Sequence, residues 1–250
     1  MGAVRVQTKS ATADAQSGNP ATVSVTFTTT PIVGNFITVE AGMGGSGAEV
    51  ITTCTFSDNK ANVYTTDVVL CDHLSIAKQV AIGSAPITIS SATFTVTVGW
   101  VNTGVHSDYL WITVQEWSGI ALAGSLDKTA STDHHATTSS PADTGASATL
   151  TQANEIVVAA VMHGGTATYT KEAAGTVPSS GWTEEYNSSG SVTENGAAAT
   201  VIVTVTTGAR MEWTLGTVQK WMAVLATYKV TGQVSGATFA RQAVKRAGSF

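Results

Sequence analysis

The chain has 250 residues, of which 43% are hydrophobic and only 12% are charged, and its net charge is −5. The hydrophobic share excludes a disordered chain, and the negative balance argues against nucleic acid as a partner, because a phosphate-binding surface needs clustered Lys and Arg. No apolar run approaches the roughly 18 residues that a membrane helix requires, so we expect no membrane association.

Strands are favoured over helices throughout, because Thr and Val are abundant and β-branched side chains fit a pleated surface. Residues 1–20 are interpreted as an N-terminal arm, which lacks the apolar core of a secretory signal. The first strand is expected at Ala21–Thr30, where Val23, Val25 and Phe27 alternate with polar residues.

A hairpin is predicted next, with strands Val50–Ser57 and Val63–Leu70 joined by the turn Asp58–Asn62. The cysteines flank this turn: Cys54 lies in the first strand and faces about Thr66, whereas Cys71 lies beyond, so the two are not direct cross-strand neighbours. A disulfide requires Cα atoms within about 7 Å. We therefore favour two buried free thiols over a bonded pair.

Turn signals recur roughly every 8 to 15 residues, a spacing typical of a sandwich rather than of βαβ units. The polar stretch Ser131–Ser147 is interpreted as the connection between two halves. The other strands are expected at His73–Ile82, Thr93–Trp100, Asp108–Gly119, Glu155–His163, Ala167–Lys171, Trp182–Asn187, Ala198–Thr206, Met211–Leu215 and Lys220–Val230.

Part of the chain is repeated. Asn35–Gly45 recurs as Asn154–Gly165, and in both copies Ile, Val, Ala and Met are two residues apart and glycines follow. Period two places these four side chains on one face of a strand. A weaker similarity links Thr93–Val98 and Trp111–Trp117 with Thr200–Val205 and Trp221–Tyr228.

The repeat predicts an all-β fold, a jelly-roll-like antiparallel β-sandwich built from two related halves. One Greek-key unit leaves a hydrophobic sheet face uncovered, and packing it against its duplicate covers that face. The sandwich is expected over residues 21–230, with halves at 21–130 and 149–230, followed by a basic C-terminal tail at 231–250.

The order of turns and core strands over residues 20–230 resembles a β-sandwich module of phage virion and tail-associated structural proteins and of some bacterial surface proteins. The similarity rests on Gly34–Val39, Ser57–Thr65, Val114–Gly119, Leu126-Asp127, Gln152–Val158 and Gly181–Thr183. These are fold-level motifs, not active-site motifs. The resemblance implies a non-enzymatic module displayed on a surface.

No catalytic signature is found: G-x-S-x-G, the Walker loop, H-E-x-x-H and the EF-hand loop are all absent from the sequence. We therefore expect no enzyme activity and no cofactor. His134 and His135 are adjacent, so their side chains point opposite ways on an extended chain, and a solvated loop is favoured over a metal site. His163 is interpreted as a strand-end residue rather than a base.

Paired carboxylates are equally unsupported. Glu184 and Glu185 are consecutive and face opposite sides of a strand. Glu40 and Glu116 could lie close on adjacent strands, but each is interpreted as a polar, outward-facing position. The sequence thus offers no facing pair of the kind that glycosidases use.

Aromatic side chains form one candidate binding surface. Tyr109, Trp111 and Trp117 share a strand parity, opposite to that of the apolar residues Leu110, Ile112 and Val114. If the apolar set faces the core, the aromatic set is an exposed stripe, suited to a protein interface or a glycan platform. The alternative is that both faces of this strand are buried.

The tail is the second candidate, because it carries the only basic cluster of the sequence. Phe239, Arg241, Lys245 and Arg246 are interpreted as a partner-binding segment, with a solvated tail as the alternative.

Taken together, these features predict a structural protein of a virion, a capsid decoration, fibre or tail-associated subunit. It is expected to form a homo-oligomer, to contact other virion proteins and to be made in the host cytoplasm. The alternative is an extracellular carbohydrate-binding or adhesion module with a glycan ligand.

Deleting Ala237–Phe250 is expected to leave the sandwich folded and to weaken attachment to the partner, most clearly at low salt, because three exposed charges are screened by ions. Binding of truncated and full-length protein to particles at low and high salt measures this. Equal occupancy at every salt concentration contradicts the prediction.

Overall fold

The computed structural model describes residues 2–17, 19–45, 50–72, 78–103, 108–188 and 195–232, which form sixteen strands and no helix. The first half contains β1 (Val4–Gln16), β2 (Ala21–Thr26), β3 (Phe36–Gly45), β4 (Val50–Asp58), β5 (Thr65–Asp72), β6 (Lys78–Pro86), β7 (Thr95–Thr103) and β8 (Asp108–Ser118). The second contains β9 (Leu126–Asp133), β10 (Ala142–Asp143), β11 (Glu155–His163), β12 (Tyr169–Lys171), β13 (Thr183–Asn187), β14 (Gly196–Val203), β15 (Glu212–Leu215) and β16 (Trp221–Tyr228).

Both halves have the same topology. In the first, a five-stranded sheet of order β1-β8-β3-β6-β5 faces a three-stranded sheet of order β2-β7-β4. In the second, the orders are β13-β14-β11-β16-β9 and β10-β15-β12, so adding eight to each strand number converts one half into the other. The pairings between named strands are antiparallel. The all-β sandwich with two similar halves is confirmed, and each half is a complete jelly-roll-like sandwich by itself.

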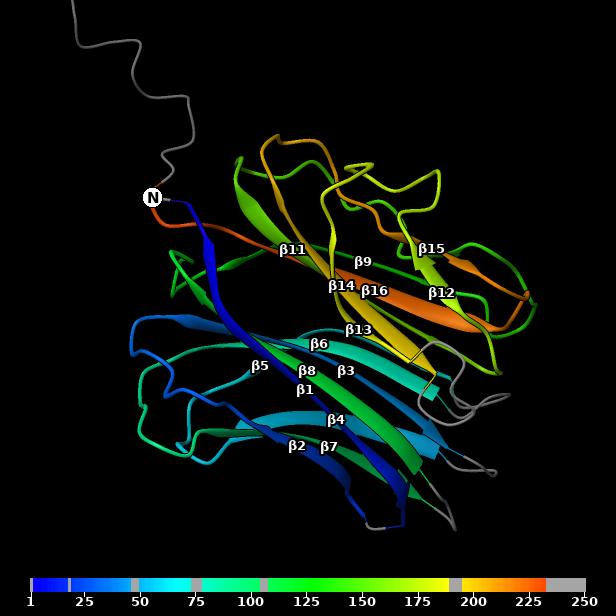
Figure 1. Cartoon of the computed structure of the whole chain (residues 1–250), viewed down its shortest axis with the longest axis horizontal. Coiled ribbons are helices and arrows are strands. Elements are labelled where there is room, and N and C mark those ends of the chain that lie inside the picture. Colours follow the sequence, from blue (N-terminus) through cyan, green and yellow to red (C-terminus); the bar gives the residue numbers. More distant parts are fainter. Residues whose placement is uncertain are drawn as a thin grey trace, which may run out of the picture.

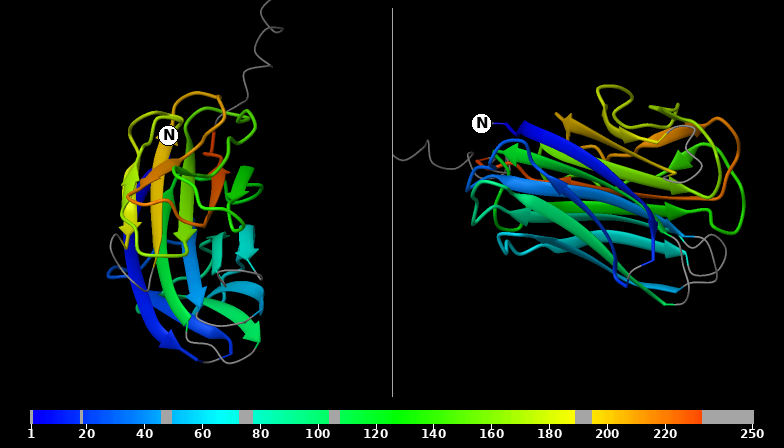
Figure 2. Two further views of the ribbon diagram at one scale, coloured as in Figure 1. Left: turned by 90° about the vertical axis from the view of Figure 1, so that its right-hand side faces the viewer. Right: turned by 60° about the horizontal axis from the view of Figure 1, so that its bottom comes forward.

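The two sandwiches stack by their five-stranded sheets, giving four layers with the small sheets outermost (Figures 1 and 2). Three apolar cores fill the spaces between the layers. One lies within the first half and one within the second. The third joins the halves, because it contains β3, β6 and β8 residues together with β11, β14 and β16 residues. Each large sheet is therefore covered on both faces.

The repeated segments form β3 and β11, the middle strands of the two large sheets. In each copy the four spaced side chains share a face, as predicted. The faces differ, however. The β3 set lies in the first half's own core and consists of Ile37, Val39, Ala41 and Met43. The β11 set lies in the core between the halves and consists of Ile156, Val158, Ala160 and Met162. The weaker similarity places Thr93–Val98 at β7 and Thr200–Val205 at β14, which are not equivalent strands.

Two boundaries differ from the sequence analysis. Residues 1–20 are not a separate arm, because β1 pairs along its length with β8 at the edge of the large sheet. The halves meet near Gly119–Ser125 rather than at Ser131–Ser147, because β9 pairs with β16 of the second half. Alternating burial along β9 marks it as an ordinary edge strand.

The predicted hairpin is a corner between two sheets. β4 pairs with β7 in the small sheet and β5 pairs with β6 in the large one, so the two strands do not pair with each other. Asp58 stabilises the corner by accepting hydrogen bonds from the backbone N–H groups of Lys60 (2.7 Å) and Asn62 (3.2 Å). Cys54 and Cys71 are free thiols.

The two halves are closely packed around Trp111 of β8. Its indole Nε1 donates to the Sδ of Met162 in β11 at 2.7 Å, and its ring stacks on Tyr186 of β13 with centroids 4.8 Å apart. Gly42 in β3 and Gly196 in β14 make room for the indole, because a Cβ at either position would overlap its Nε1. One aromatic side chain of the first half is thus enclosed by three strands of the second.

Replacing Gly196→Ala is expected to destabilise the protein by about 1–3 kcal/mol, since the added methyl group overpacks the core between the halves. Urea unfolding followed by tryptophan fluorescence measures the change. Gly2→Ala is the matched control, because its Cβ has no heavy atom within 4 Å. Equal midpoints for the two variants contradict the prediction.

Candidate functional site

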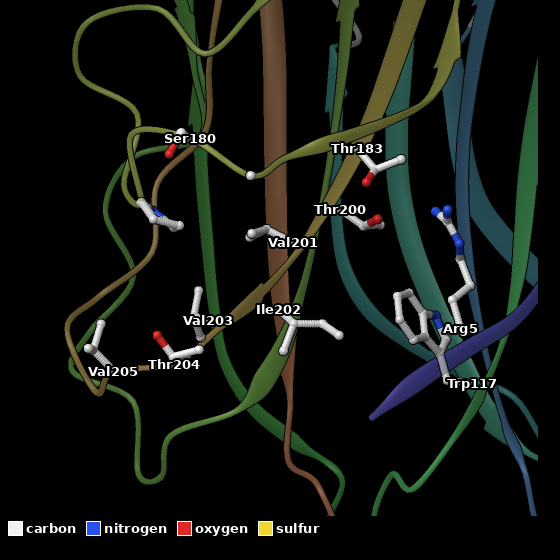
Figure 3. Close-up of a pocket in the computed structure, with 12 residues that line it drawn as sticks. Arg5, Trp117, Ser180, Thr183, Thr200, Val201, Ile202, Val203, Thr204 and Val205 are labelled. Carbon is white, nitrogen blue, oxygen red and sulfur yellow. The ribbon is translucent and has the colours of Figure 1, made fainter. Parts of the chain in front are cut away.

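A groove of about 460 Å³ lies where the two large sheets diverge (Figure 3). The first half contributes Arg5 of β1 and Trp117 of β8, and the second contributes residues 200–205 of β14 and its extension, together with the loop 178–183. We call it the interhalf groove. Because its walls come from both halves, its shape depends on the packing of one sandwich against the other.

One margin of the interhalf groove is a partly unpaired strand. β13 pairs with β14 only from Ala197 to Thr200, whereas β11 pairs with β14 up to Val203. In the first half, the equivalent β5 pairs with β6 from Lys78 to Ser84 and covers most of that edge. Beyond Thr200, β14 therefore has a neighbouring strand on one side only among the described residues.

Arg5, which lines the groove, forms an ion pair across the halves. The Arg5 guanidinium contacts the carboxylate of Glu185, whose side chain is only 2% exposed. The same carboxylate accepts a hydrogen bond of 2.6 Å from the Thr200 hydroxyl, and the Glu185 backbone carbonyl accepts one of 3.3 Å from Ser10. A charge-assisted contact at this depth fixes the register of β1 against β13.

A second carboxyl group is buried behind this pair. Glu40 of β3 is 0% exposed, faces the second half and accepts a 2.9 Å hydrogen bond from the Gln115 side chain. Burial raises its pKa to about 8; Gln115 lowers it and the nearby Glu185 carboxylate raises it. Glu40 is therefore protonated at neutral pH, while Glu185 has Arg5 as its counter-ion.

Two of the three predicted aromatic residues are not on the surface. Trp111 is 0% and Trp117 is 3% exposed, and both lie in the core between the halves. Trp117 donates from Nε1 to the Thr38 hydroxyl at 3.2 Å. Tyr109 is half-buried. The alternative, a strand buried on both faces, is what the structure shows, so these residues do not form an exposed glycan platform.

The glutamates predicted to face outward are buried for the same reason. Glu116 is 0% exposed and accepts hydrogen bonds from the side chains of Asn35 and Gln7, both at 2.6 Å, and from the Ile32 backbone N–H at 2.8 Å. It anchors loops rather than facing Glu40. Glu184 and Glu185 do point apart: Glu184 is exposed and Glu185 is buried.

The histidines singled out from the sequence, His134, His135 and His163, do not come together as a metal site. His135 contacts Asp133 through Nδ1 at 2.6 Å, and the His134 ring stacks on Trp221 at 4.5 Å. His163 is 0% exposed at the end of β11, and burial lowers its pKa to about 4, so it is neutral. Within the described ranges, no three His, Cys, Asp or Glu side chains are grouped closely enough to hold a metal ion.

The predicted tail residues Phe239, Arg241, Lys245 and Arg246 lie outside the described residues. The groove itself was missed by the sequence analysis, because Arg5 was assigned to an arm and Glu185 to an isolated strand face. No described helix is long and apolar enough to span a membrane. A scan of protein-family models, a search of curated proteins and a search of solved structures each find no match.

The substitution Glu40→Gln is expected to change the free energy of unfolding more favourably at pH 8.5 than at pH 5. The folded-state pKa of Glu40 is raised, so the wild type loses stability as pH rises from the unfolded value, near 4.5, to about 8. Gln cannot ionise and escapes this loss, which amounts to more than about 1 kcal/mol. Urea unfolding at pH 5 and pH 8.5 measures it.

The matched control is Glu184→Gln on β13, where the residue is exposed. Its effect on the free energy of unfolding is expected to stay within about 0.5 kcal/mol at both pH values. A Glu40→Gln effect that is the same at pH 5 and pH 8.5 contradicts the assignment of a neutral, buried acid.

Proposed function

We propose that the chain is a non-enzymatic structural protein of a virion, a capsid decoration, fibre or tail-associated subunit that self-assembles and is displayed on the particle surface. The observation that carries this proposal is an exposed apolar surface at one end of the first half. Three loops there present four aliphatic side chains, which we call the apolar tip: Ile32, Val33, Val63 and Ile89.

The apolar tip is strongly exposed. The fractional exposures of its residues run from 54% for Ile89 to 80% for Val63. Single exposed aliphatic residues need no explanation, but neighbouring ones on connected loops favour a contact with another protein. The loops that carry them join β2 to β3, β4 to β5 and β6 to β7, and meet at the same end of the sandwich (Figure 1).

Hydrogen bonds hold these loops in fixed positions. The Asn62 amide donates to the Ile89 carbonyl at 2.9 Å and accepts from the Ile89 and Thr88 backbone N–H groups at 2.9 and 2.8 Å. The Gly34 N–H donates to the Ile87 carbonyl at 2.9 Å. A preorganised apolar surface loses little entropy on binding, which suits a repeated assembly contact.

The sequence resemblance supports the same reading at the level of the fold. The motif Ser57–Thr65 forms the corner that presents Val63, and Gly34–Val39 leads from the apolar tip into the central strand β3. These motifs serve turns and core strands, which is consistent with a module whose role is mechanical. In symmetric assemblies one surface is reused many times, so modest contacts suffice.

The alternative, a carbohydrate-binding or adhesion module, loses its main support. That hypothesis rested on an exposed stripe of Tyr109, Trp111 and Trp117, and the two tryptophans are enclosed between the halves. The turn residue Asp58 is engaged in the corner with Lys60 and Asn62.

The purified protein is expected to be a homo-oligomer in size-exclusion chromatography with light scattering, and to bind no sugar on a glycan array. The double variant Ile32→Lys/Val63→Lys is expected to raise the dissociation constant of the oligomer or of its complex with virion proteins by at least tenfold, because it charges the apolar tip.

Val218→Lys is the matched control, since Val218 is 60% exposed and belongs to the second half. It is expected to assemble like the wild type. A strictly monomeric wild-type protein that binds a glycan would falsify the proposed function.

A further inference from the structure

The two halves are joined by one passage of the chain. Strands β1–β8 form the first half and β9–β16 the second, so within the described residues the chain crosses between them once, after β8 ends at Ser118. Each half has a complete strand order and an apolar core of its own (Figure 1). A half therefore keeps its internal packing whichever chain supplies the half that it packs against.

The hinge of this passage is a single residue, Gly119. On one side of it, Ser118 still pairs with Val4 of β1 in the first half. On the other side, Ile120 already forms an antiparallel β-bridge with Val230 of the second half. The relative direction of the two halves therefore depends on the backbone conformation at Gly119.

The arrangement within one chain needs a conformation at this hinge that suits glycine. The φ of Gly119 is +80°, in the left-handed region that L residues rarely adopt, and a Cβ there would lie 2.8 Å from the Gly2 carbonyl oxygen. With an extended hinge, the second half would point away from the first, and the facing surfaces of both large sheets would need another partner.

We propose that two copies of the chain exchange halves, so that the first half of one chain packs on the second half of the other. Gly119 is the hinge, and the contacts between halves are the same in the closed monomer and in the exchanged dimer. This inference rests on the proposed function, because it identifies one way in which copies self-assemble.

The interface between the halves carries this inference. Its apolar core contains residues of both large sheets, so separated halves would expose that core to water. Two polar contacts, Tyr228 with Asp67 at 2.6 Å and Arg5 with Glu185, define the same relative position for any two halves that meet. Exchange keeps all these contacts and changes only the hinge, so it favours a dimer once the protein is concentrated.

A charge exchange at the interface tests the proposal. Arg5→Glu and Glu185→Arg each place like charges at the contact between halves, both in a closed monomer and in a dimer of identical chains. Only a dimer that exchanges halves between the two variants has opposite charges at both of its interfaces. When the variants are unfolded and refolded together, native mass spectrometry is expected to show at least tenfold more heterodimer than either homodimer.

A hinge variant leaves the interface unchanged. Gly119→Ala disfavours the left-handed turn and brings a Cβ against Gly2, so it is expected to raise the association constant of the dimer at least tenfold. Size-exclusion chromatography with light scattering over a range of concentrations measures this constant.

The matched control is Gly124→Ala. Gly124 also has a positive φ, +58°, but a Cβ there meets no heavy atom within 4 Å. Backbone groups on both sides of its loop are hydrogen-bonded to Lys229, so this loop belongs to the second half and is the same in monomer and dimer. The control is expected to leave the association constant of the dimer unchanged.

Crosslinking identifies which chain supplies the facing half. The ring of Tyr186 stacks on Trp111 across the halves, so a photoreactive benzoylphenylalanine in place of Tyr186 reacts with the first half that it touches. This probe is placed in Gly119→Ala protein, and isotope-labelled and unlabelled chains are refolded together. In the dimer fraction, crosslinks are expected between labelled and unlabelled chains.

Three outcomes overturn the inference: folded charge variants that give no excess of heterodimer, a Gly119→Ala protein that dimerises no more than Gly124→Ala, and dimers whose crosslinks are confined to single chains. If the charge variants do not fold, the hinge variant and its crosslinks decide alone. When the inference fails but Ile32→Lys/Val63→Lys abolishes the oligomer, the proposed function stands. A wild-type protein that stays monomeric at every concentration overturns both.

Discussion

Burial of both faces of each large sheet is the constraint on which the structure depends. All nine residues of β11 and all eight of β16 are buried, because one face meets the small sheet of the same half and the other meets the opposite large sheet. Neither half alone could leave such a sheet in water. The core between the halves makes the two sandwiches one folding unit and also creates the walls of the interhalf groove.

Polar groups in that middle layer are held by partners from both sides. Tyr228 of β16 donates to Asp67 of β5 at 2.6 Å, and Arg5 of β1 is paired with Glu185 of β13. Buried charges of this kind contribute little net stability, because desolvation offsets their attraction. Their effect here is on register: each contact is satisfied at one relative position of the sheets, whereas apolar contacts tolerate sliding.

Much of the fold was predictable because strands have a period of two. The all-β class and the two related halves follow from the repeat of β3 and β11. The errors share a physical cause. Glu40, Glu116 and Trp111 were assigned to an outer face, although all three are buried. Alternation of side chains along a strand separates two faces, but it does not indicate whether a second layer covers the outer face. When both faces of a strand are covered, its side chains are buried whichever face they point to. The two copies can therefore turn the same residues toward different cores. The groove depends on where β13 stops, and no local pattern encodes that.

The unequal lengths of β5 and β13 break the internal symmetry of the molecule. β5 pairs with β6 from Lys78 to Ser84, whereas β13 pairs with β14 only from Ala197 to Thr200. The two halves therefore share a strand order but not a surface, and a molecule bound in the interhalf groove would meet a strand edge that has no equivalent at the corresponding place in the first half.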